Sequence, residues 1–404
     1  MDTLQKIRVV GRDMHLESDS ENDQICAPVV GGRQLPARPV ATIPISEVAL
    51  PGGRKMKVVK SMLTTACERN CNYCPFRAGR SKMQRITIKP DEMAQVSYQA
   101  YRQRLVEGLF LSSGIIKGGV TTQDKLIDTA EILRNKLGFR GYLHLKIMPG
   151  ADRDQVRRSM QLADRISVNL EGANTRRLAT LAPMKKFAEE LLAPLKWAQE
   201  IRVNEAPAST WNGRWASSVT QFVVGGADET DVELVSTSEY LYHELKLKRT
   251  YYSAFSPIID TPLENHRPEN PWREHRLYQA SFLLRDYGFA MEELPFNQSG
   301  NLPLNKDPKT AWAEQTLLHK PVEVNTATRE QLLLVPGIGP KSADAILRAR
   351  RLHAITSLEQ LKELGIVPKR SAPFVLLNGR QPSFQPRLMD MAEPTPQLRP
   401  RFPG

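Results

Sequence analysis

The chain contains one stretch on which its fold depends, Lys57-Val-Val-Lys-Ser-Met-Leu-Thr64, followed closely by Cys67-Glu-Arg-Asn-Cys71-Asn-Tyr-Cys74. The first part is short and rich in apolar and β-branched residues, which is typical of a buried strand. The second part places three of the chain's four cysteines within eight residues. Cysteines this close together favour a metal site over disulfides. We therefore expect a metal-binding loop that leaves the end of a strand.

Similar short apolar segments recur along the chain and alternate with segments of helical periodicity. The six expected strands are Lys57–Thr64, Gly108–Ser112, Tyr142–Ile147, Ile166–Leu170, Val219–Val224 and Thr250–Phe255. The expected helices include Pro90–Val106, Thr122–Leu137, Asp152–Ala163 and Asp231–Leu247, with Trp272–Tyr287 closing the unit. This alternation predicts an α/β fold with a parallel sheet.

Two of the expected strands carry polar side chains on one face, because side chains alternate between the faces of a strand. These residues are Tyr142, His144 and Lys146 on the third strand, and Ser167, Asn169 and Glu171 on the fourth. A barrel with its helices outside would turn these faces inward, and a packed core avoids such residues, so we predict an interior binding cavity. A flat sheet with one wet face is the alternative, which the alternating helices disfavour.

The cysteine spacing distinguishes two kinds of metal site. Three thiolates can ligate a four-iron cluster and leave one iron open to a small chelating ligand. Structural zinc usually takes four ligands, but no fourth Cys or His lies nearby and Cys26 is far upstream. The motif therefore favours an iron–sulfur cluster held by Cys67, Cys71 and Cys74.

The C-x3-C-x2-C loop after a first strand, with Tyr73 before the third cysteine, resembles the radical S-adenosylmethionine (SAM) superfamily over about residues 55–290. The resemblance implies a partial (β/α)6 barrel, a [4Fe–4S] cluster, and SAM that is cleaved reductively to a 5′-deoxyadenosyl radical. The implied cofactor contacts are Tyr73, Ser112, Ser113, Gly114, Ser167, Asn169, Glu171, Gly226 and Glu229. The loop at 222–229 departs from the superfamily motif, because Phe222 replaces its first glycine and Val224 its isoleucine.

Two interior residues are candidates for catalysis. Lys146 and His144 could hold an anionic substrate or transfer a proton. The alternative is that Lys146 pairs with Glu171, since buried charges need partners.

Residues 325–350 predict a helix, a tight turn and a second helix. Thr328 and Gln331 have the spacing of a capping box, and Pro336-Gly-Ile-Gly-Pro340 must break the helix. This pattern resembles the helix-hairpin-helix of DNA repair and DNA uptake proteins, which implies a phosphate site at the hairpin and the following helix N-terminus. The candidate DNA-binding residues are Gly337, Ile338, Gly339 and Lys341. Protein contacts alone are the alternative use of such a hairpin.

A degenerate second hairpin is expected within Ser357–Val375, with Val367 in place of the second glycine. Residues 320–380 contain ten Lys or Arg and five Asp or Glu, and the whole chain carries a net charge of +12. This net positive charge is of the sign that favours binding of a polyanionic partner.

These patterns divide the chain into five expected parts. They are an irregular lead-in over 1–52, the barrel over 53–296, a linker over 297–318, a small all-α helix-hairpin-helix domain over 319–380, and a disordered Pro-rich tail over 381–404. No apolar run is long enough to cross a bilayer and the first residues lack a signal-peptide core, so we expect a cytoplasmic protein without a membrane partner.

The whole chain resembles a family of radical SAM proteins in DNA modification or repair that is linked to a uracil-DNA glycosylase-like partner. The matching stretches are Glu107–Gly114, Gly141–Gly150, Ala163–Glu171, Leu181–Pro183 and Tyr251–Pro257. The resemblance implies DNA as substrate and an electron donor such as flavodoxin or ferredoxin. Two alternatives remain: a radical SAM enzyme that modifies RNA or nucleotides, and a non-catalytic iron–sulfur adaptor that binds DNA for a repair glycosylase.

Overall fold

The computed structural model divides the chain into two compact units, which are described separately. The described residues are 1, 3–13, 43–49, 55–80 and 83–383. The first unit comprises Met1–Glu229 and Tyr240–Glu269, and the second comprises Thr230–Glu239 and Asn270–Gly404. Cys26 and most of the Pro-rich tail lie outside the described residues.

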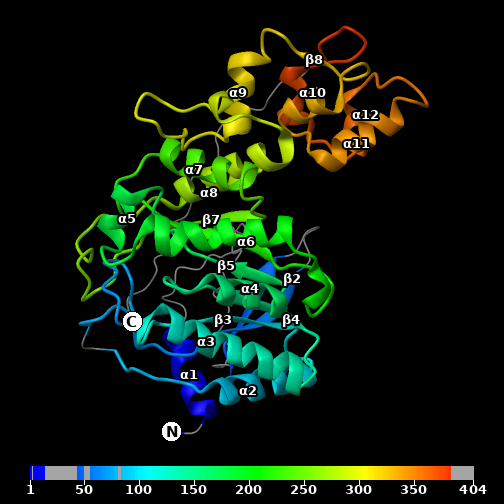
Figure 1. Ribbon diagram of the computed structural model, residues 1–404. Coiled ribbons are helices and arrows are strands. Elements are labelled where there is room, and N and C mark those ends of the chain that lie inside the picture. The colour runs from blue at the N-terminus through cyan, green and yellow to red at the C-terminus, as the bar shows by residue number, and fades with distance from the viewer. Residues whose placement is uncertain (2, 14–42, 50–54, 81–82, 384–404) are drawn as a thin grey trace, which may run out of the picture. The chain divides into compact units, whose positions relative to one another are not determined.

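A curled sheet of seven strands, in the order β1-β2-β3-β4-β5-β6-β7, forms the centre of the first unit (Figure 1). The strands are β1 Ile45–Ala49, β2 Lys55–Met62, β3 Gly108–Ser112, β4 Tyr142–Lys146, β5 Arg165–Ser167, β6 Ser217–Val224 and β7 Arg249–Ala254. Strands β2 to β7 are parallel to one another, with Val59 opposite Leu109 and Leu109 opposite Leu143. All six expected strands are present, so the predicted α/β fold with a partial barrel is confirmed.

Helices cover the outer face of this sheet (Figure 1). They are α2 Pro90–Arg102, α3 Gly118–Glu131, α4 Arg153–Leu162, α5 Thr175–Leu181 and α6 Ala193–Asn204, and α7 Asp231–His243 crosses the boundary between the units. Helices α2, α3, α4 and α6 pack against one another in that order. Helix α4 begins at a capping box, in which the Asp152 backbone N–H donates to Gln155 Oε1 at 3.0 Å. The apolar residues Leu143, Leu145 and Ile166 are fully buried.

The expected irregular lead-in is wrong for its described residues, because they contain a helix and a strand. Helix α1 (Thr3–Asp13) buries Ile7 and Val10 completely, and Lys6 pairs with Glu92 of α2 at 2.9 Å. Strand β1 pairs antiparallel with β2 at the edge of the sheet. Proline is disfavoured in central strands but is tolerated beside an edge strand, which is why Pro44 can precede β1.

The second unit is mainly helical. Its helices are α8 Pro271–Phe282, α9 Pro308–Thr316, α10 Arg329–Leu334, α11 Pro340–Ala349, α12 Leu358–Glu363 and α13 Pro368–Ser371. Three differences from expectation appear here. Helix α8, expected to close the barrel, belongs to this unit, and the expected linker contains α9, whose Trp312 packs on Phe289 with ring centroids 5.1 Å apart. Strands β8 (Val322–Glu323) and β9 (Val375–Leu376) also pair, although this part was expected to be all-α.

Candidate functional site

The three-cysteine loop follows β2 and is held on one side by the residues after β3. The Gly114 N–H donates to the Thr64 carbonyl at 2.8 Å, and the Ile115 N–H donates to Cys67 Sγ at 3.4 Å. A Cβ at position 114 would lie only 2.1 Å from the Ala66 carbonyl oxygen. Only glycine therefore fits at this contact without a backbone shift.

The other side of the cysteine loop is held by the end of α5 and by the segment that follows it. The backbone N–H of Asn72 donates to the Leu181 carbonyl at 2.7 Å, and its side chain donates to the Thr180 carbonyl at 2.8 Å. The Arg69 guanidinium reaches Glu190 at 2.7 Å. The loop is thus fixed from two directions by segments 48 and 115 residues away in sequence.

The three thiols themselves are unpaired and close enough to influence one another. Cys71 is buried and Cys74 Sγ accepts a hydrogen bond from the Phe76 N–H at 3.4 Å. Burial raises the pKa of Cys74, and the neighbouring Cys71 and Cys67 add to this rise. Three thiols on one clamped loop, with N–H donors to two of the sulfurs, fit the ligand set of an iron–sulfur cluster. In the described ranges no three His, Cys, Asp or Glu side chains converge on the position of a single metal ion.

A buried ion pair lies beside the cysteines. Lys185 Nζ is 3.0 Å from Glu171 Oε1, and the two side chains are 10% and 6% exposed. Burial alone would lower the pKa of Lys185, but the neighbouring Cys71 and Glu171 raise it, so the lysine is charged. Glu171 has a left-handed backbone, with φ 63°, a conformation rare outside glycine. Burial raises the pKa of Tyr73, and the charge of Glu171 raises it further. Tyr73, a predicted cofactor residue, therefore lies close to this ion pair.

This ion pair corrects one sequence hypothesis and adds one residue. Glu171 pairs with Lys185, whereas the sequence hypothesis gave it Lys146 as its partner. Lys185 was missed because it lies in a loop with no recognised motif. Its position four residues after Leu181, within the segment that the family resemblance covers, was the available signal.

The other predicted cofactor residues lie on loops at the ends of β3 and β6. Ser113 Oγ donates to the Gly114 carbonyl at 2.7 Å, and Ser112 is buried. Glu229 accepts hydrogen bonds from the N–H groups of Gly225 at 2.6 Å and Ala227 at 3.3 Å, so this carboxylate holds its own loop together. Gly226 packs closely, because a Cβ there would lie 2.9 Å from Leu181 Cδ2.

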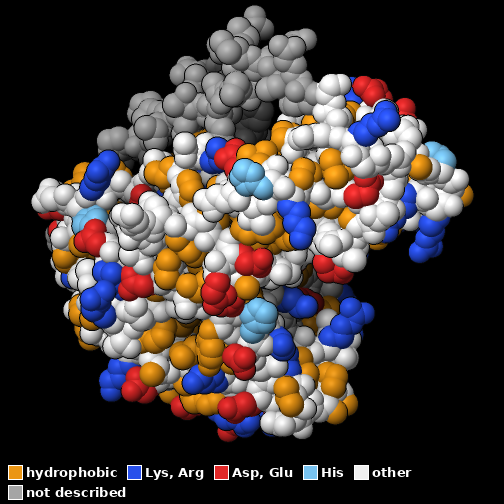
Figure 2. Space-filling model, turned by 90° about the horizontal axis from the view of Figure 1, so that it is seen from above, with side chains coloured by type: hydrophobic (Ala, Val, Ile, Leu, Met, Phe, Trp, Pro, Cys, Tyr) orange, Lys and Arg blue, Asp and Glu red, His pale blue; other side chains and the backbone are white. Residues whose placement is uncertain are grey.

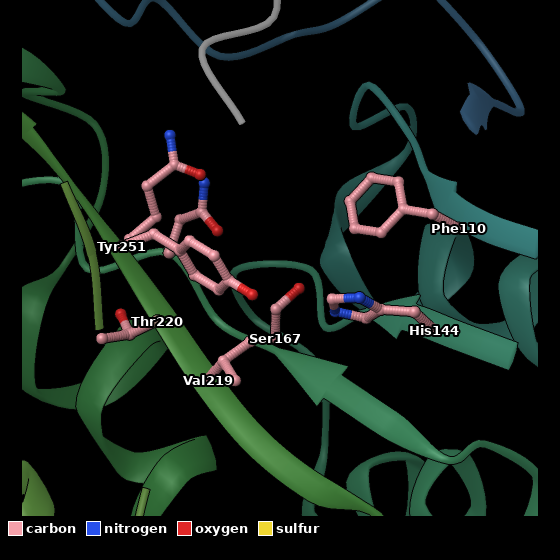
Figure 3. Close-up of a pocket in the computed structure, with 8 residues that line it drawn as sticks. Phe110, His144, Ser167, Val219, Thr220 and Tyr251 are labelled. Atoms are coloured by element: carbon pink, nitrogen blue, oxygen red, sulfur yellow. The ribbon is translucent and has the colours of Figure 1, made fainter. Parts of the chain in front are cut away.

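A pocket opens inside the sheet, on the polar faces that the sequence indicated. Its lining residues are Phe110, His144, Ser167, Asn169, Val219, Thr220, Gln221 and Tyr251. Figure 3 shows the Phe110 and His144 rings and the Ser167 and Tyr251 hydroxyls around the same space. The Phe110 and His144 rings meet edge to face, with centroids 4.6 Å apart. Ser167 Oγ is buried and bonds to no protein atom in the described part of the chain. Lys146, at the end of β4, does not line the pocket.

The first hairpin joins α10 to α11, and its capping box is present as predicted. Thr328 Oγ1 accepts from the Gln331 N–H at 3.3 Å, and the Gln331 side chain accepts from the Thr328 N–H at 2.8 Å. Ile338 is buried, as expected of an anchor, whereas Lys341 is exposed.

The two hairpin glycines differ in backbone conformation and in the atoms that a side chain at each position would meet. Gly337 has φ 85°, and a Cβ there would lie 3.1 Å from the Val367 carbonyl oxygen of the second hairpin. Gly339 has an ordinary extended backbone, with φ −105°, and a Cβ there would lie 3.3 Å from the Tyr287 hydroxyl. Gly337 thus packs the two hairpins together, while Gly339 is the N-cap of α11.

The expected second hairpin joins α12 to α13. Gly365 has φ 80°, and its carbonyl accepts from Ser342 Oγ of α11 at 3.3 Å. Val367, at the place of a second glycine, is 48% exposed. On the face in Figure 2, basic and acidic side chains are interspersed, so net charge alone does not locate a nucleic-acid site there.

Two family models match the chain. Residues 61–241 match the Radical SAM superfamily, and residues 320–349 match the Helix-hairpin-helix motif. The chain therefore contains a radical SAM domain and a helix-hairpin-helix. No described helix is both long and apolar enough to pass through a membrane.

Several solved structures are similar to part of the chain. The FeFe-hydrogenase maturase HydG from Carboxydothermus hydrogenoformans has a TM-score of 0.45 and 14% identity, over 56% of this chain and 50% of that one. Methylornithine synthase (PylB) has a TM-score of 0.44 and 14% identity, over 56% and 61% of the two chains. This chain thus spans about half to three-fifths of their lengths. The comparison with curated proteins gives no match.

Proposed function

We propose that the protein is a radical SAM enzyme that modifies or repairs DNA. The observation that carries this proposal is the combination, in one chain, of a radical SAM domain with a helix-hairpin-helix. The exposed Lys341 in the first turn of α11 supports it, because a helix N-terminus and a lysine together suit a phosphate. Such contacts hold the nucleic-acid backbone and carry no base information.

In this proposal Cys67, Cys71 and Cys74 hold a [4Fe–4S] cluster. A cluster held there would supply the electron for the reductive cleavage of SAM. The Lys185–Glu171 pair offers a cation and an anion beside the cysteines, which are complementary to the carboxylate and amino groups of SAM. An external donor such as a flavodoxin or ferredoxin provides the electron.

The barrel interior is the proposed place of the substrate. His144, Ser167 and Asn169 line the pocket there, while Ser112, Ser113, Gly114, Gly226 and Glu229 shape the loops around SAM. Lys146 stands at the carboxyl end of β4, where it can hold an anionic group or transfer a proton. A uracil-DNA glycosylase-like protein is the proposed partner in the cytoplasm.

The experiment that tests this function offers several substrates to the same enzyme. The full chain, reconstituted anaerobically, is incubated with SAM, a reductant and duplex DNA, tRNA or free nucleosides. Mass spectrometry then follows 5′-deoxyadenosine and the nucleosides released by digestion. A new mass among the DNA nucleosides is the expected result. A change confined to tRNA or nucleosides supports the RNA or nucleotide enzyme, and no 5′-deoxyadenosine with any substrate supports the adaptor.

A further inference from the structure

Lys309 of α9 is a buried lysine that contacts the backbone of the first hairpin. Its side chain is largely hidden, with 8% of the residue exposed, and its Nζ donates to the Ile338 carbonyl at 2.7 Å. In the part of the chain that the structure describes, no carboxylate lies within ion-pair distance of it. A buried cation without such a partner is costly, so its position calls for a role.

The groups that face Lys309 come from three elements. The Tyr287 ring lies beneath Nζ, with its centroid 4.5 Å away. Asp307, the N-cap of α9, and Arg370 of α13 act on it through their charges, and these two pair with each other at 2.7 Å. Burial lowers the pKa of Lys309 to about 7, Arg370 lowers it as well, and Asp307 opposes them. Near neutral pH, a small change in the burial of Lys309 or in the charges near it therefore decides whether its amine is protonated.

The hydrogen bond to Ile338 fixes the direction of the next peptide group. The peptide bonds of the described residues are trans, so the C=O of Ile338 and the N–H of Gly339 point in opposite directions. Because Lys309 holds this carbonyl inward, the Gly339 N–H points away from Lys309, at the N-cap of α11. A charged donor at the carbonyl also polarises the peptide and strengthens its N–H as a donor.

We infer that Lys309 is a positioning residue of the hairpin, which aims and polarises the Gly339 N–H for a DNA phosphate and makes DNA affinity depend on its own protonation. The inference rests on the proposed function, because it assumes that this hairpin binds DNA. A bound phosphate favours the charged amine, so binding takes up a proton near neutral pH. DNA affinity should therefore rise as the pH falls.

The test measures DNA affinity of the full chain as a function of pH. Fluorescence anisotropy with a labelled duplex is recorded at constant ionic strength from about pH 6 to about pH 8.5, which brackets the titration of Lys309. The parent should bind about tenfold more tightly at the acidic end, which corresponds to a rise of about one unit in the pKa of Lys309 on binding.

Three variants separate the charge of Lys309 from its hydrogen bond. Lys309→Arg stays charged, so it should bind tightly throughout and lose the pH dependence. Lys309→Gln can still donate to the Ile338 carbonyl but carries no charge, so it should bind weakly throughout. Lys306→Gln removes the same charge just before α9 and should keep the parental pH profile, because Lys306 pairs with Glu314.

Each outcome decides between the inference and the function on which it rests. A parental pH profile in Lys309→Arg or in Lys309→Gln overturns the inference while DNA binding stands. A parent that binds no duplex at any pH contradicts DNA as the substrate, and the inference falls with it. Thermal melting shows which variants are folded, and Lys309→Arg alone suffices if Lys309→Gln unfolds.

Discussion

Lys185 and Glu171 form a buried ion pair, with 3.0 Å between Nζ and Oε1, and both charges act on the Cys71 thiol. Burial raises the pKa of Cys71, and Lys185 opposes this rise. A cation at this position compensates the negative charge of thiolate ligands in a poorly solvated site. The pair therefore links the predicted cofactor-binding strand to the cysteine loop.

Changing Lys185 to Met should destabilise the cluster-free protein and weaken SAM binding. Removal of one partner leaves Glu171 buried without compensation, which costs about 3 kcal/mol of unfolding free energy. Denaturant unfolding and a SAM titration measure the two effects. Lys186→Met is the matched control, because Lys186 is the next residue and is exposed. If the two variants behave alike, the ion pair has no special role.

Changing Gly114 to Ala should lower the amount of iron bound per chain. The added Cβ cannot be placed 2.1 Å from the Ala66 carbonyl oxygen, so the cysteine loop must move. Iron and sulfide analysis after anaerobic reconstitution measures the loss. Ser113→Ala, which removes only a hydrogen bond to the Gly114 carbonyl, should keep full iron. Full iron in Gly114→Ala would show that the loop tolerates the shift.

Each of Cys67, Cys71 and Cys74 should be required for the cluster, whereas Cys26 should not. Substitution of any one of the three by Ala removes an iron ligand and should abolish both the visible absorbance of the cluster and SAM cleavage. Cys26→Ala is the control and should retain both. Metal analysis that finds one zinc and no iron in the parent would contradict the iron–sulfur assignment.

The two hairpin glycines should respond differently to substitution by Ala. Gly337→Ala forces a left-handed residue against the Val367 carbonyl, and the strain should lower the stability of the second unit by about 1–2 kcal/mol. Gly339→Ala has an allowed backbone and should fold, but its Cβ crowds the N-cap and should weaken DNA binding.

Lys341→Ala should reduce the salt dependence of DNA affinity by about one unit of slope. Thermal melting and salt-dependent anisotropy distinguish these effects, and equal losses of stability in both glycine variants would refute the distinction.

Much of the fold could be predicted because each feature was local in the sequence. The six parallel strands, the cysteine loop and the capping box of α10 all follow from periodicity or spacing. Strand β1 could not be predicted because the prolines around it in the sequence argue against a central strand, although an edge strand tolerates them nearby. Residue spacing alone could not identify Lys185, since its importance comes from a contact with Glu171, 14 residues away.

Lys309 was missed for a similar reason. In the sequence it stands in an apparently polar linker, whereas the structure buries it against Ile338, 29 residues later. The same linker supplies Asp307, which caps α9 by accepting from the Thr310 N–H at 3.0 Å. Tertiary contacts of this kind have no signature in residue spacing.

The central claim is that one chain couples SAM cleavage to DNA. The most direct measurement is the rate of 5′-deoxyadenosine formation by the reduced, reconstituted protein, with and without duplex DNA, for the parent and for Gly339→Val. DNA should increase the rate in the parent, whereas Gly339→Val should keep the basal rate but need more DNA for the increase. A rate that DNA does not change, or a Gly339→Val protein with the parental response to DNA, would contradict it.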